Sequence, residues 1–114
     1  MILLESARAA GGGNIAWYDL ETDKREIIVE GITAASGLAL SPDRTTLLYT
    51  EGRSRPDGKL FLVQNFIQNL QVRKVLEGIN KPRHIAIDED GTIYLASRDG
   101  ILRLRKRLDE LRKT

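Results

Sequence analysis

Short apolar segments of this sequence recur at a spacing of about 46 residues, and this repeat constrains the fold more than any other feature. Glu30–Ile32 returns as Glu77–Ile79, and Thr46–Thr50 returns as Thr92–Ala96. Each apolar segment is short and ends at turn residues, as β-strands do. A repeat of roughly 40–50 residues made of short strands is typical of β-propeller blades. The repeat therefore predicts an all-β fold of four-stranded antiparallel propeller blades.

The repeat divides the chain into ten predicted strands, named a to d within each blade. Strands b, c and d of a first blade fall within residues 2–30, and a complete blade spans residues 37–77. Strands a, b and c of a third blade fall within residues 84–105, and a basic tail (106–114) follows them. We therefore treat residues 1–114 as a single partial propeller domain.

Ten strands amount to about two and a half blades, whereas closed propellers use about four to eight. An unclosed ring would leave strand edges and apolar blade faces in contact with water. We therefore expect that the chain is not a stable monomer. Either it is a piece of a longer propeller, or it completes a ring by self-association as a homotrimer or a homodimer.

The composition excludes several other classes of protein. The chain has 114 residues, no cysteine and a formal net charge of +2. Without cysteine there is no disulfide framework and no thiolate metal site. No apolar run approaches the roughly 20 residues that span a bilayer, and no signal-peptide core is recognisable. These features favour a cytoplasmic location and no membrane partner.

Positive charge is concentrated near the C-terminus, where residues 98–114 contain seven lysines and arginines. Four of these form the run Arg103, Arg105, Lys106 and Arg107, but no aromatic residue lies among them on which a base could stack. We interpret this run as a solvated surface and predict no nucleic-acid partner. Residues 107–114 could form either a helix or a further d strand, because their leucines fit both patterns.

Two segments resemble motifs of the senescence-marker-protein/gluconolactonase family. Ser36–Glu51 is similar to the family's Asn-Gly-Leu-Ala-hydrophobic-Ser-Pro-Asp-Gly-x-x-Leu-Tyr segment. Pro82–Ala96 is similar to its Pro-Asp-Gly-Ile-Ala-Val-Asp-x-x-Gly-x-hydrophobic-Tyr-Val-Ala segment, and equally to NHL repeats. Strictosidine-synthase-like and paraoxonase-like propellers share these motifs. The resemblance implies a six-bladed propeller.

In the lactonases, the resemblance also implies a calcium ion, held at the channel mouth by an Asn, an Asp and a Glu. The Asn position is Ser36 in this chain, the Asp position is Arg83, and His84 replaces the Gly that follows. A hard cation needs several oxygen ligands, and an arginine would repel it. We therefore expect no cofactor and no tight calcium site; calcium enters only if the family's activity persists.

Successive strands of a blade run in opposite directions, so alternate loops lie on the same face. The loops before strand a therefore share a face with the loops between strands b and c. These loops carry a group of polar and basic residues, which we call the rim: Ser36, Arg53, Arg83, His84 and Arg98. Guanidinium groups suit carboxylates and phosphates, so the rim is the predicted binding site for a small anion. The alternative is that these arginines are scattered, solvated loop residues.

Other conspicuous residues have structural explanations. Asp88–Gly91 fits a hairpin turn, Gly11–Gly13 fits a flexible loop, and Trp17 aligns with Leu62 and is predicted to lie in the core. His84 is the only histidine. A general base needs a nucleophile or a water within hydrogen-bond reach, and the sequence places neither beside it. No catalytic residue is identified.

Three functions remain open at this level. The favoured one is a non-catalytic or degenerate lactonase-like propeller module that binds or assembles. The second is a calcium-dependent lactone or ester hydrolase whose site forms only in the oligomer. The third is an engineered or excised blade module. The sequence leaves enzymatic activity undecided and favours its absence.

Overall fold

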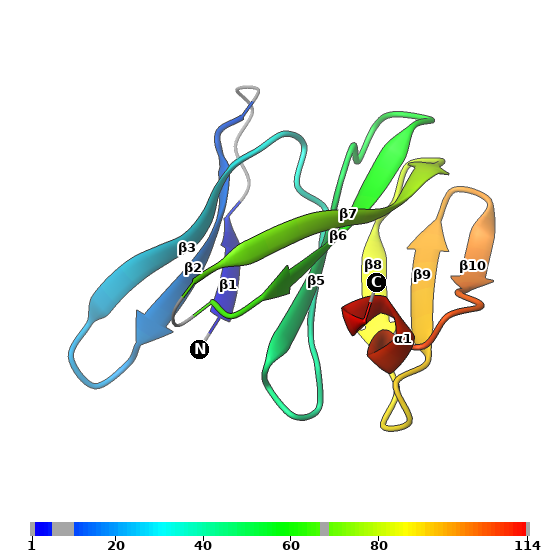
Figure 1. Ribbon diagram of the computed structural model, residues 1–114. Coiled ribbons are helices and arrows are strands. Elements are labelled where there is room, and N and C mark those ends of the chain that lie inside the picture. Colours follow the sequence, from blue (N-terminus) through cyan, green and yellow to red (C-terminus); the bar gives the residue numbers. More distant parts are fainter. Residues whose placement is uncertain (1, 6–10, 67–68, 114) are drawn as a thin grey trace. The chain divides into compact units, whose positions relative to one another are not determined.

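The computed structural model describes residues 2–5, 11–66 and 69–113 (Figure 1). These residues form ten strands in three antiparallel sheets, together with one short helix. The all-β prediction is confirmed. The chain divides into two units, Met1–Ala35 and Ser36–Thr114, each of which is described by itself. No helix in the described ranges is long and apolar enough to cross a membrane.

The first unit is a three-stranded sheet in the order β1 (Ile2–Glu5), β2 (Gly13–Asp19) and β3 (Lys24–Ile32). Trp17 of β2 is 45% exposed, so the prediction that it lies in the core is wrong. Its counterpart Leu62 is covered by other elements of its own unit. The described residues of the first unit form a single sheet, which offers no second layer to cover Trp17.

The second unit contains one sheet of four strands and one of three, and in each sheet every strand pairs with the next along the chain. A two-stranded antiparallel connection needs only a short turn, which explains why sequential strands become neighbours. The strands of the larger sheet are β4 (Gly37–Leu40), β5 (Thr46–Glu51), β6 (Gly58–Gln64) and β7 (Gln71–Ile79). Those of the smaller sheet are β8 (His84–Ile87), β9 (Ile93–Ser97) and β10 (Gly100–Arg103).

A single apolar cluster joins the two sheets of the second unit to helix α1 (Leu108–Arg112). Its members come from the central strands of both sheets, from the end of β7 and from the helix. They are Leu48, Leu60, Leu62, Ile79, Ile93, Leu95, Leu108 and Leu111, each at most 6% exposed. Because these side chains leave water together, the two sheets and the helix should unfold as one structure.

The tail forms a helix, the first of the two conformations that the leucine spacing allowed. Arg112 fixes the helix to the turn between β4 and β5: its Nη1 donates to Asp43 Oδ2 (2.9 Å) and its Nη2 donates to Asp43 Oδ1 (3.2 Å). This guanidinium, together with hydrogen bonds from Ser41 and Thr45, holds the pKa of Asp43 well below its usual range. On β7, Arg73 donates to the carbonyl oxygen of Leu111. The helix is therefore held by polar contacts at its end as well as by its buried leucines.

Candidate functional site

Three loops of the second unit meet at one end of its sheets. The amide of Lys81, in the loop before β8, donates to the carbonyl oxygen of Arg55 (2.7 Å), which lies between β5 and β6. The amide of Arg98, between β9 and β10, donates to the carbonyl oxygen of Asn80 (2.9 Å). These backbone hydrogen bonds bring together the loops that strand alternation places on one face.

Ser36 and Arg83 lie at the starts of neighbouring strands. The amide of Ser36 donates to Thr50 O (3.1 Å), and the amide of Arg83 donates to Ala96 O (2.8 Å). A Cβ atom on Gly37 would lie 3.2 Å from Arg83 O, which shows how closely β4 approaches β8 at this point. The two positions that the resemblance assigns to metal ligands are therefore adjacent in the fold.

The backbone of the rim forms several hydrogen bonds, whereas its charged side chains are exposed to solvent. Arg53, Arg83, His84 and Arg98 are all exposed. No salt bridge joins any of them to a carboxylate in the described part of the chain. The structure therefore brings the predicted residues to one face, with cationic groups free to turn toward a ligand, but it does not hold their guanidinium groups in a fixed arrangement.

The residues at the calcium position do not fit a calcium ion. The Ser36 hydroxyl forms a hydrogen bond with the Thr50 hydroxyl (2.9 Å), and the neighbouring Arg83 brings a positive charge. Among the residues that the structure describes, no three His, Cys, Asp or Glu side chains lie together in a way that could hold a metal ion. One hydroxyl beside a guanidinium lacks the several oxygen ligands that calcium requires.

The structure also contains a basic hollow that the sequence analysis missed, at the opposite end of β9 from the rim. It is lined by Thr92, Arg103, Leu104, Arg105 and Arg107. The sequence marked three of these residues as a basic run and interpreted them as a solvated surface. The signal that could have revealed more is the spacing of the arginines, which occupy every second position and so tend to share one side of an extended chain.

Comparison with known proteins adds no relative. The sequence matches no protein-family model, and none of the curated proteins compared with it is similar enough to count as a relative.

Proposed function

We propose that the chain is a set of β-propeller blades that self-associates into a closed ring and serves as a non-catalytic module for binding or assembly. The observation that carries this proposal is the contrast between the two sheets of the second unit. One has four strands, the number in a propeller blade, whereas the other has three and ends at β10. The motifs shared with the gluconolactonase group support the same fold.

Among the described residues, strand β10 is the outer strand of its sheet. It pairs with β9 on one side, and all four of its residues are exposed. Ile101 is 77% exposed and Leu102 is 41% exposed, so the edge combines free backbone groups with apolar surface. Isolated proteins usually protect such an edge with charges, prolines or covering segments. A strand from a second copy would complete the sheet; in a longer propeller, the same chain would supply it.

Two observations favour a module without lactonase chemistry. The residues at the resemblance's metal positions do not suit calcium, because the Ser36 hydroxyl is shared with Thr50 and Arg83 is cationic. His84, the single histidine, is exposed at the start of β8. Calcium-dependent hydrolysis is therefore the less supported alternative.

The first prediction concerns mass in solution. Light scattering on the purified chain at micromolar concentration should give a dimer or trimer of the 12.8 kDa subunit. Ile101→Lys should weaken association at least about tenfold, because a lysine on the edge strand opposes pairing with another strand. Leu20→Lys is the matched control, since Leu20 is 71% exposed but lies in a turn, and it should associate as the wild type does. A folded wild-type monomer would contradict the proposal.

The second prediction concerns the rim, where we propose that a small anion binds. Repetition of Arg83 around the mouth of a ring would concentrate positive potential there, and binding should weaken as salt shortens the Debye length. With citrate as the probe, Arg83→Gln should abolish binding measured by calorimetry. Arg44→Gln, in the exposed turn between β4 and β5, should leave citrate binding unchanged. Equal weakening by the two variants would show that the rim has no special role.

A further inference from the structure

After β10, residues 104–108 form an arch beside the smaller sheet, and one hydrogen bond closes the arch at each end. The amide of Leu104 donates to Ile93 O (3.0 Å), and the amide of Leu108 donates to Gly91 O (2.8 Å). From Leu104 to Leu108 the arch therefore takes four residue steps, whereas the facing segment from Ile93 to Gly91 takes two. Its middle residues, 105–107, must bow away from the sheet, and this is where the basic hollow lies.

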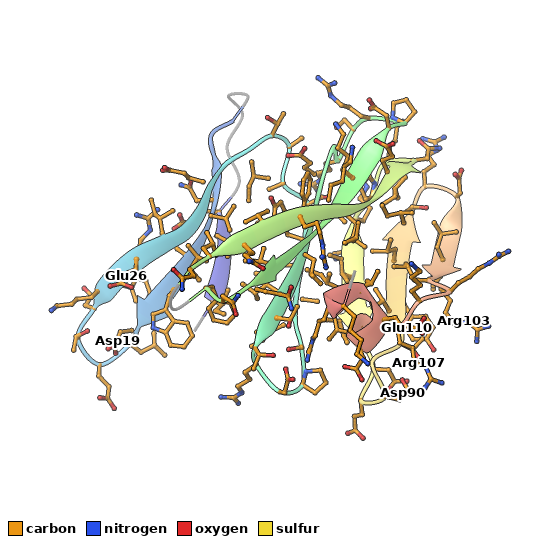
Figure 2. The ribbon with its side chains drawn as sticks, viewed as in Figure 1. Asp19, Glu26, Asp90, Arg103, Arg107 and Glu110 are labelled. Atoms are coloured by element: carbon orange, nitrogen blue, oxygen red, sulfur yellow. The ribbon has the colours of Figure 1, made fainter. Side chains whose placement is uncertain are left out.

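Positive charge is in excess at this arch. Arg103, Arg105 and Arg107 supply three of the five residues that line the hollow, and all three are exposed. Arg103 and Arg107, both labelled in Figure 2, come from the end of β10 and from the residue that precedes helix α1. Among the described residues, no carboxylate forms a salt bridge with Arg103 or Arg105. Their charges are therefore available to a ligand.

Two acidic residues that interact with Arg107 also accept hydrogen bonds from the backbone. Asp90 accepts a hydrogen bond from the amide of Thr92 (3.0 Å), and Glu110 accepts one from the amide of Arg107 (3.4 Å). Backbone and hydroxyl hydrogen bonds from Thr92 lower the pKa of Asp90, with a smaller contribution from the charge of Arg107. These carboxylates fix the turn and the start of the helix, and among the described residues neither forms a salt bridge with Arg103 or Arg105.

We propose that this hollow, which we call the arginine arch, binds a small anion that carries phosphate groups. Guanidinium groups make paired, charge-assisted hydrogen bonds to phosphate oxygens, and several of them match the multiple charge of a diphosphate. None of the described residues that line the hollow is aromatic, so they offer no platform on which a nucleic-acid base could stack. The arginine arch lies away from the rim and does not depend on ring closure, so this inference is independent of the proposed function.

The test uses pyrophosphate as the probe and calorimetry at constant ionic strength, with chloride as the balancing ion. Arg103→Ala and Arg105→Ala should each weaken binding about tenfold, the effect of removing one charge-assisted hydrogen-bonding group. Arg44→Ala, in the exposed turn between β4 and β5, is the matched control and should leave pyrophosphate binding unchanged. Because all three side chains are exposed, the variants should keep the circular-dichroism spectrum and unfolding temperature of the wild type.

The location of binding can be measured without any substitution. In an amide-resolved NMR titration, pyrophosphate should shift the signals of Thr92 and residues 105–107 and leave those of Leu62 and Val63 on β6 in place. Three results would overturn the inference: no binding at millimolar pyrophosphate, equal weakening by Arg44→Ala and Arg105→Ala, or tighter binding of a short single-stranded oligonucleotide that is lost in the same arginine variants. The last result would identify a nucleic-acid surface instead.

Discussion

Replacement of Leu95 by alanine should lower the free energy of unfolding by about 3 kcal/mol, because it removes a fully buried side chain and leaves a cavity. Leu95 lies on β9 with 0% exposure, in the cluster that joins both sheets of the second unit to α1. The loss should appear in urea unfolding as a lower midpoint at an unchanged slope. Protein concentration must be held fixed, since self-association adds to apparent stability.

The matched control for Leu95 is a leucine on the surface of the same unit. Leu70, just before β7, has the same side chain and is 44% exposed. Leu70→Ala should therefore cost less than about 1 kcal/mol, since most exposed positions tolerate truncation. A similar loss in both variants would mean that the cluster does not dominate stability.

The sequence predicted the strands well because the signal for them is local. An apolar run bounded by turn residues specifies a strand and its hairpin partner, and the repeat supplies that signal more than once. The Asp88–Gly91 turn illustrates this: the amide of Gly91 donates to Asp88 O (3.0 Å), as a tight turn requires. The gathering of the rim loops was also predictable, since it depends only on strands alternating in direction.

Features that depend on tertiary contacts were not predictable in the same way. The leucines of the tail fit both a helix and a strand, and burial of Leu108 and Leu111 in the cluster accompanies the helical alternative. Trp17 was assigned to the core by analogy with Leu62, but alignment between repeats does not supply a covering layer. The arginine arch requires hydrogen bonds from Leu104 to β9 and from Leu108 to Gly91 in the turn before β9, and no short-range pattern specifies them.

The glycine at position 58 should be the least replaceable residue at the rim end of the second unit. A Cβ atom there would lie 2.4 Å from Cδ and 2.6 Å from Cγ of Pro82, and 2.7 Å from Ile79 O. Pro82 is fully buried, so its ring has no space into which it can move. Gly58→Ala should therefore cost about 3 kcal/mol, the upper part of the usual range for overpacking, in the same urea assay.

Gly78→Ala separates this steric effect from the general cost of replacing a glycine. Gly78 has φ +76°, but no atom lies within 4 Å of the Cβ position, so alanine there should cost about 1 kcal/mol through backbone strain alone. Equal losses in the two variants would contradict the steric explanation.

A double variant identifies the atoms responsible for the effect at Gly58. Pro82→Ala removes the ring atoms that the new methyl group would meet, whereas Ile79 O stays in place. In a double-mutant cycle, Gly58→Ala should therefore cost about 1–2 kcal/mol less when residue 82 is already alanine, because the two changes share one contact. If the unfolding free-energy losses of the two single variants simply add, the clash at Gly58 involves only the Ile79 carbonyl oxygen. The expected smaller loss in the double variant would show that contact with the Pro82 ring causes part of the effect. The absence of a side chain at Gly58 would then be what allows the loop carrying Arg83 to pack against β6.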